Sequence, residues 1–377
     1  MPLKLTNIGN DSEVALDKVE YIEENNVRYF RVSNSENIGA NFQYIPIATS
    51  NWDKELYEIY LFENSYLNAE NDVFQVYENT ISEERLGWVF PITILESNEN
   101  DYREFSNLNN YKYVAYKKLF ELNFKIQARD NTNEFLKLSE VFGNIIICIL
   151  CKETTKKIKE FKFENYILSF YKYGYLLLSD FPKSNAIYDR TAFITEMRSN
   201  SRVNLTKAKF DITNNEFTKS LFIEHLLQSD NFLVRFIFLY QIVEHFIDEF
   251  SETQFKEHIE NYQSKKLAKN DFRECINKSA TERKLLIDLF NSTLIQKELK
   301  EEFITEVDFL YNDLGRVTKK NSFPDKIYNV RNLVTHSLRE LTTKSELLKK
   351  ITELFERIIV DLLINYKIKN ETEIEEE

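Results

Sequence analysis

The sequence predicts an α+β protein of two domains: a β-rich domain over residues 1–214, built as a sandwich or barrel, and an all-α bundle over residues 215–370. Two observations predict this division. Short runs rich in β-branched and aromatic residues, separated by clusters of Asn, Asp, Ser and Glu, fill the first 200 residues. Beyond residue 215 the apolar residues recur at three- and four-residue steps, which is the period of a helix.

The expected strands of the first domain are short and closely spaced. They are predicted at 27–32, 55–62, 73–77, 87–95, 122–128, 144–150 and 166–178. Asn110 to Phe120 is compatible with a helix or a long strand. Because no long helical period separates these runs, an antiparallel sandwich or open barrel is predicted. The aromatic residues between Tyr166 and Tyr175 are interpreted as core packing in preference to a base-stacking surface.

The second domain is predicted to be a bundle of about five or six helices. One begins near Thr218, and the next covers 231–250 with Asp230 as its cap. Two or three more are expected between Thr253 and Asp313. The bundle closes with two further helices that have clear start signals.

These start signals lie on either side of residue 340. Ser322, with Pro324 just inside, is typical of a helix start. Thr343 and Glu346 have the spacing of a capping box, and a strong apolar stripe follows them. The tail 371–377 contains five Glu residues, so we expect it to be solvated and disordered.

The composition excludes several classes of function. With six glycines, five prolines and no G-x-G-x-x-G or G-x-x-x-x-G-K-S/T pattern, the chain offers no glycine-rich nucleotide site, and no cofactor is expected. The start of the chain lacks an apolar signal segment, and the longest apolar run, 145–151, is too short for a bilayer. We therefore expect a cytoplasmic protein with no membrane partner. Cys148 and Cys151 lack a second pair and a nearby His, so buried thiols are favoured over a metal site.

The charge is unevenly distributed. The formal net charge of −12 argues against a nucleic-acid partner. Residues 1–200 contain 22 Lys/Arg and 30 Asp/Glu, whereas residues 201–370 contain 27 Lys/Arg and 26 Asp/Glu. The segment 316–339 holds six basic residues against one acid. A local basic patch of this kind is sufficient for an enzyme that grips a few phosphates.

One motif in the second domain contains residues suited to catalysis: Arg331-Asn332-Leu333-Val334-Thr335-His336. Its R-x4-H pattern follows an amphipathic Tyr/Glu helix around 238–246 and precedes a strongly apolar helix. In this combination the chain resembles the HEPN ribonucleases over residues 218–366. The resemblance implies an all-α HEPN bundle and a metal-independent endoribonuclease. The order of a β-rich half and a C-terminal HEPN domain is also similar to the ApeA-type arrangement.

The residue types suit this chemistry. RNA is cut without a metal when its own 2′-OH attacks the adjacent phosphate, a reaction that needs a proton-transfer group and a cation. His336 supplies the first, because imidazole titrates near neutral pH. Arg331 supplies the second, because its planar fork binds two phosphate oxygens. We expect Asn332 to orient the phosphate or the imidazole ring, and the resemblance implies 2′,3′-cyclic phosphate and 5′-hydroxyl ends.

The helix geometry adds a constraint. Residues five apart on a helix are separated by about 140°, so Arg331 and His336 of one chain are poorly placed to embrace a single phosphate. The resemblance implies a symmetric homodimer with a composite site. It also implies that Glu244 orients Arg331 through an ion pair, with Asp248 as the substitute if the register is off by one turn.

The resemblance also suggests partners and a role. The basic residues near the motif that we expect to bind RNA are Lys319, Lys320, Lys326 and Arg339. Proteins with this motif commonly act as toxins or abortive-infection anti-phage effectors, with tRNA or mRNA as target. The first domain would then sense a phage-derived trigger or recruit the effector, and a separate antitoxin is compatible with the sequence.

Other interpretations remain open. Arg331 and His336 are also compatible with ordinary surface residues near a helix C-terminus. A non-catalytic HEPN module for dimerisation or RNA binding, with a ligand-binding β domain, is the main alternative. In a third, the β domain carries the function and the helices only dimerise. Lys265, Lys266 and Lys269 are interpreted as a solvated helix face, with RNA contact as the alternative.

Overall fold

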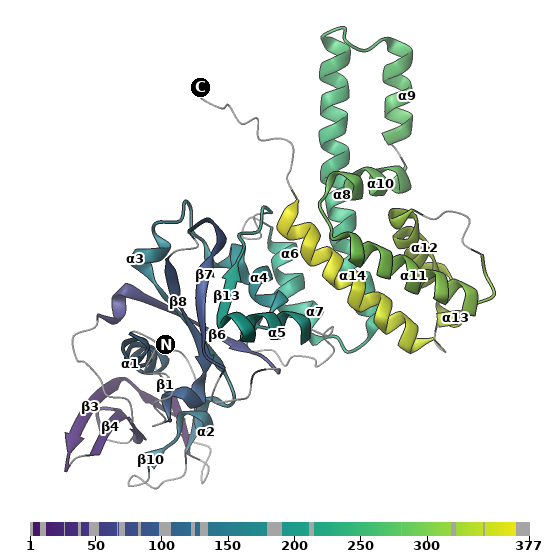
Figure 1. The fold of residues 1–377 in the computed structure, drawn as a ribbon. Coiled ribbons are helices and arrows are strands. Elements are labelled where there is room, and N and C mark those ends of the chain that lie inside the picture. Colours follow the sequence, from purple (N-terminus) through teal and green to yellow (C-terminus); the bar gives the residue numbers. More distant parts are fainter. Residues whose placement is uncertain are drawn as a thin grey trace. The chain divides into compact units, whose positions relative to one another are not determined.

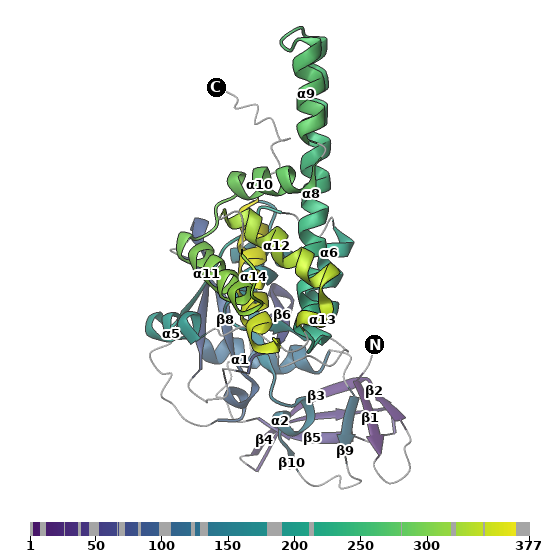
Figure 2. The same cartoon turned by 90° about the vertical axis from the view of Figure 1, so that its right-hand side faces the viewer.

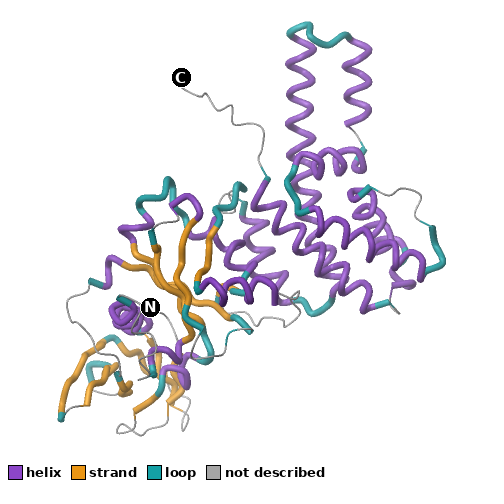
Figure 3. The backbone as a smooth tube through the Cα atoms, viewed as in Figure 1, coloured by secondary structure: helices purple, strands orange, loops and turns teal. Residues whose placement is uncertain are grey.

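The computed structural model describes residues 3–366 except 8–12, 26, 37–38, 45–52, 66, 68–71, 82–83, 98–106, 122–124, 129–134, 179–190, 211–214, 280, 318–321 and 342–343. The predicted α+β division is confirmed, because strands dominate up to residue 205 and helices follow from residue 216 (Figure 3). The chain forms two compact units, one mainly from Met1–Lys162 and Arg190–Thr206, the other mainly from Lys207 onward with Phe163–Ser169.

The described strands of the first unit form three sheets. The described strands are β1 (Leu3–Asn7), β2 (Glu13–Leu16), β3 (Lys18–Glu24), β4 (Val27–Ser33), β5 (Gly39–Gln43), β6 (Tyr57–Glu63), β7 (Phe74–Glu78), β8 (Arg85–Pro91), β9 (Lys125–Ala128), β10 (Phe135–Leu136), β11 (Ile146–Cys151), β12 (Leu176–Leu177) and β13 (Arg202–Leu205). They are ordered β2-β1-β9, β10-β5-β4-β3 and β12-β6-β11-β8-β7-β13. The expectation of purely antiparallel sheets is wrong, because β9, β10 and β13 each join an earlier strand in parallel.

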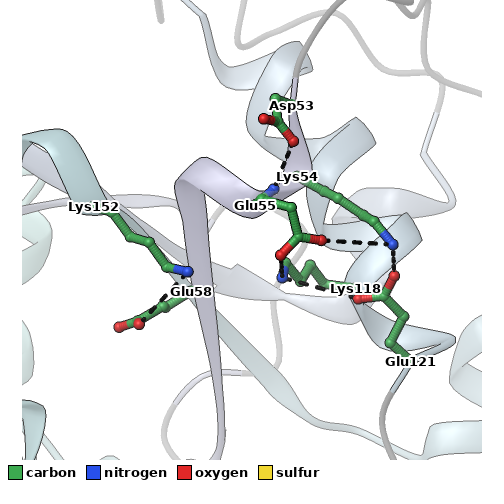
Figure 4. Close-up of polar contacts among 7 residues, drawn as sticks. All are labelled: Asp53, Lys54, Glu55, Glu58, Lys118, Glu121 and Lys152. Atoms are coloured by element: carbon green, nitrogen blue, oxygen red, sulfur yellow. Dashed lines mark hydrogen bonds and ion pairs between the residues drawn. The ribbon is translucent and has the colours of Figure 1, made fainter.

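Helices lie between these strands along the chain. The described ones are η1 (Lys54–Leu56), η2 (Asn79–Ile81), η3 (Ile92–Leu95), α1 (Leu108–Leu119), α2 (Leu138–Phe142), α3 (Lys152–Thr155), η4 (Phe163–Tyr166), α4 (Ile167–Lys172) and α5 (Thr191–Asn200). Of these, η4 and the first three residues of α4 belong to the second unit. Ion pairs near the surface join residues 53–58 to α1, to Glu121 just after it, and to α3 (Figure 4): Lys118–Glu55, Lys54–Glu121 and Lys152–Glu58. Solvent-accessible pairs of this kind contribute little to stability.

The ambiguous segment 110–120 forms the buried helix α1 (Figure 1). Tyr116 stacks on Phe30 of β4 at a ring-centroid distance of 5.3 Å, and Tyr111 contacts Tyr57 of β6 at 5.2 Å. The helix therefore packs against both the four-stranded and the six-stranded sheet. Its residues are buried on several sides, which removes the polar face by which an amphipathic helix is recognised.

The strand predicted over 166–178 is wrong. Tyr166 ends η4, α4 follows, and only Leu176 and Leu177 pair with β6. Tyr166 and Phe170 are fully buried, in agreement with their interpretation as core residues. A run of aromatic and apolar residues with only Ser169 and Lys172 as polar positions has no clear period, so it does not distinguish a buried helix from a strand.

The second unit is helical. Its elements are α6 (Glu216–Ser220), the π-helical turn η6 (Leu221–His225), α7 (Leu226–Gln228), α8 (Phe232–Gln263), α9 (Lys269–Ser279), α10 (Glu282–Ser292), α11 (Lys297–Asp313), α12 (Phe323–His336), α13 (Leu338–Leu341) and α14 (Ser345–Asn365). The apolar stripe of α14 is buried against α8 and α11. Among the described helices, none is both long and apolar enough to cross a membrane.

Helix α8 differs from its prediction at both ends. Its cap is Asn231, whose side chain accepts hydrogen bonds from the backbone of Leu233 and Val234, so the expected cap Asp230 is wrong by one residue. The helix also runs past the expected end at residue 250 to Gln263, because no Gly or Pro interrupts this stretch. The acidic tail 371–377 and Thr343 lie outside the described residues.

Candidate functional site

Helix α12 positions the R-x4-H motif. As predicted, it begins after Ser322, whose Oγ accepts a hydrogen bond from the Asp325 backbone at 3.4 Å. Pro324 occupies the first turn, where a missing N–H costs nothing. Two spacer residues of the motif, Leu333 and Val334, are buried and anchor the helix in the core. Their burial turns the other motif residues toward the surface.

Arg331 is held between two carboxylates from different helices. Its Nη2 lies 3.9 Å from Oε1 of Glu244 on α8, and its Nε lies 3.6 Å from Oε1 of Glu282 on α10. The guanidinium carbon lies 5.8 Å from the centre of the Tyr240 ring. The Arg331 side chain is 26% exposed. The site thus presents an oriented cation that retains access to solvent.

Glu282 and Tyr240 complete this arrangement. The Tyr240 hydroxyl donates to Glu282 Oε1 at 2.8 Å, and burial raises the pKa of Tyr240, which keeps the donor protonated. The neighbouring Arg283 donates from Nε to Asp325 Oδ1 at 2.7 Å. The first turn of α10 therefore contacts α12 at two points. Sequence reasoning missed Glu282, because no local spacing connects it with Arg331.

The other motif residues lie apart. Asn332 accepts a hydrogen bond from Arg331 Nη1 at 3.3 Å, so its amide contacts the cation. His336 is exposed and is the last residue of α12. Within the described residues, its ring has no hydrogen-bond or ion-pair partner. The spacing of five residues separates His336 from Arg331 by about 140° around the helix axis.

The predicted RNA-binding residues have different surroundings. Lys326 is fully buried and forms an ion pair with Asp308 of α11, so its assignment to an RNA-binding surface is wrong. It shares the buried face of α12, where a lysine requires an acidic partner. Arg339 is exposed on α13. Lys319 and Lys320 lie outside the described residues.

The expected burial of the thiols holds for Cys148, whereas Cys151 and Cys275 are only partly buried. Cys148 is buried on β11, and this burial raises the pKa of its thiol. Cys151 lies three residues further along the same strand, so the two side chains point to opposite faces of the sheet. In the described part of the chain, no group of three or more His, Cys, Asp or Glu could hold a metal ion.

The Glu244 carboxyl gives a stability prediction. Burial raises the pKa of Glu244 above the ordinary value of 4.5; Arg331 lowers this pKa, and Glu282 and Asp248 raise it. The negative charge of Glu244 is therefore less favourable in the folded protein than in the unfolded chain. Above the unfolded pKa this charge lowers the free energy of unfolding. We expect Glu244→Gln to raise the melting temperature at neutral pH, with the gain lost as the pH falls below about 4.5. A lower melting temperature at neutral pH would instead show that the Arg331 ion pair outweighs burial.

Comparison with protein-family models, with curated proteins and with solved structures gave no match. The function is therefore inferred from the side chains of the site and from the resemblance of its motif. The site consists of a half-buried cation held by two carboxylates, with an exposed imidazole on the same helix.

Proposed function

We propose that the helical unit is a HEPN-type endoribonuclease that cuts RNA without a metal ion. The observation that carries the proposal is the setting of Arg331, which is partly exposed and bracketed by Glu244 and Glu282. Ion pairs of this length between partly exposed side chains contribute little to stability. They do fix the orientation of the guanidinium before a substrate binds, and the remaining exposure of Arg331 leaves it accessible to a phosphate.

The proposed reaction assigns a role to each residue. His336 takes the proton from the 2′-OH, the 2′ oxygen attacks the adjacent phosphorus, and the bond from phosphorus to the 5′ oxygen breaks. His336, which now carries that proton, then gives a proton to the departing 5′ oxygen. Arg331 stabilises the negative charge of the phosphorane. The products are a 2′,3′-cyclic phosphate and a 5′-hydroxyl.

Glu244 and Glu282 act on Arg331 in different ways. The Glu244 contact is the longer one, and the Glu244 side chain is 47% exposed, so a substrate phosphate displaces it at little cost. Glu282 is held in turn by Tyr240 and remains as the positioning residue for the guanidinium. Asn332 restrains the fork by accepting a hydrogen bond from Nη1 of Arg331.

A symmetric homodimer completes the site in this proposal. Because Arg331 and His336 of one chain face about 140° apart, Arg331 of one copy works with His336 of the second copy. In the cell we propose a cytoplasmic toxin or abortive-infection anti-phage effector that acts on tRNA or mRNA. The β-rich unit would respond to a phage-derived trigger, or an antitoxin would hold the effector inactive.

Mixing two inactive variants tests the composite site. We expect Arg331→Ala and His336→Ala chains to be inactive alone and to regain cleavage when exchanged into mixed dimers. Each mixed dimer then contains one site with both residues intact, so activity returns to about a quarter of wild type if subunits exchange at random. Cleavage is measured on tRNA in EDTA. Variants that are inactive alone and remain inactive as verified mixed dimers would contradict a site shared between two chains.

A further inference from the structure

Helices α8 and α9 form a hairpin that extends beyond α10 in both views (Figures 1 and 2). We call residues 251–279 the α8–α9 arm. None of the described side chains in the arm is buried, whereas residues 235–247 of the same helix α8 contribute eight buried side chains. The two helices of the arm contact each other through Tyr262 and Phe272, whose ring centroids are 4.8 Å apart. The arm therefore adds surface to the helical unit and little core.

Charge is segregated along the arm. Residues 251–260 contain one Lys and three Glu, a net charge of −2. Residues 261–273, which we call the arm tip, contain four basic residues and one Asp, a net charge of +3. The four cations of the tip are exposed, and within the described residues none of them has an ion-pair partner: Lys265, Lys266, Lys269 and Arg273.

The tip also carries an aromatic ring. Tyr262 is 40% exposed and lies three residues before Lys265, at the end of α8. Exposed aromatic rings among basic side chains are typical of nucleic-acid surfaces, where bases stack on the rings and phosphates contact the cations. On a chain with a net charge of −12, a cationic tip attracts a polyanion that most of the chain repels.

We propose that the arm tip binds the phosphate backbone of the same RNA that is cut at Arg331. This inference rests on the proposed function. Helix α8 carries Glu244, beside Arg331, and ends at Gln263 in the tip. At a rise of 1.5 Å per residue, these two positions are roughly 30 Å apart. The arm therefore selects RNA that extends on the order of ten base pairs from the cut, and short oligonucleotides gain nothing from it.

A neutralising variant and a matched control test this inference. The arm variant is Lys265→Gln/Lys266→Gln/Lys269→Gln, which removes three exposed positive charges and keeps polar side chains at these positions. The control changes exposed lysines that already have Glu partners: Lys157→Gln, Lys297→Gln and Lys350→Gln. Binding of tRNA is measured against salt concentration in a His336→Ala background, so this result does not depend on cleavage. Cleavage of tRNA and of an oligonucleotide too short to reach the tip is measured separately.

The arm variant is expected to bind tRNA more weakly and with a smaller dependence on salt. The magnitude of the slope of log affinity against log salt concentration is expected to decrease by about 2 to 3, with roughly hundredfold weaker tRNA binding near 0.1 M salt. The ratio of tRNA cleavage to short-oligonucleotide cleavage falls as well, and the control retains both values. An unchanged slope overturns the proposal and leaves the tip as a solvated face or a dock for an acidic protein. A reduced slope without any cleavage by wild type supports the arm and counts against the ribonuclease.

Discussion

Replacing either His336 or Arg331 with Ala is expected to lower the rate of RNA cleavage by about 10²- to 10⁴-fold. The first change removes the proton-transfer group, and the second removes the cation that stabilises the phosphorane. Because both residues act in one transition state, the double variant is expected to lose little more than either single variant. The rate constant on a defined RNA, measured under single-turnover conditions, checks this expectation.

Two control variants separate chemistry from folding. Arg331→Lys keeps the charge but not the bidentate fork, so its activity is expected to lie between wild type and Arg331→Ala. Thr335→Ala changes an exposed neighbour of His336 whose hydroxyl only donates to the Arg331 carbonyl of its own helix, at 2.8 Å. It is expected to retain the wild-type rate. Wild-type rates in both Ala variants would contradict the assigned roles.

Replacing Arg235 with Met is expected to lower the free energy of unfolding of the helical unit by about 3–5 kcal/mol. Arg235 and Glu356 are each 1% exposed, and Nη2 of Arg235 lies 2.5 Å from Oε2 of Glu356. Nη1 also donates to the Leu226 carbonyl at 2.6 Å. The change leaves a buried carboxylate without its cation, in the pair that joins α8 to α14. Urea denaturation followed by helical circular dichroism measures the loss.

The double variant Arg235→Met/Glu356→Leu is the informative comparison. It removes both charges, so we expect it to recover much of the stability lost by the single variant. An exposed pair supplies the control, since Lys297→Ala, which loses only Glu301, is expected to cost less than about 1 kcal/mol. A loss of the same small size in Arg235→Met would show that the buried pair does not hold the helices together.

Sequence patterns predict a helix or strand most accurately where one of its faces is buried and the other is exposed to solvent. Strand β4 and the start of α12 were predicted because apolar alternation and a Ser-x-Pro start are local signals. The sequence does not predict helix α1 or the segment 166–178 correctly, because their residues are buried on several sides. The alternation of apolar and polar residues that identifies a helix or a strand is then missing. The parallel partners of β13 and β9 depend on contacts between distant segments, which no local pattern encodes.

In the candidate site too, sequence patterns predict some contacts and miss those between distant segments. The resemblance of the motif and its preceding helix implies that Glu244, or Asp248 one turn on, lies beside Arg331, and the structure places Glu244 there. Glu282 was missed because its contact depends on how α10 packs against α12. Lys326 was assigned to the surface by its charge, whereas Asp308 compensates that charge inside the helical unit. Charge alone does not distinguish a buried paired lysine from an exposed one.

The chemistry of the RNA ends tests the proposed ribonuclease most directly. Purified protein is incubated with tRNA in EDTA, alongside the Arg331→Ala/His336→Ala variant, and the new ends are identified. We expect wild type to make 2′,3′-cyclic phosphate and 5′-hydroxyl ends that are absent with the variant. Identical cuts by both proteins, or 3′-hydroxyl ends, would contradict this expectation.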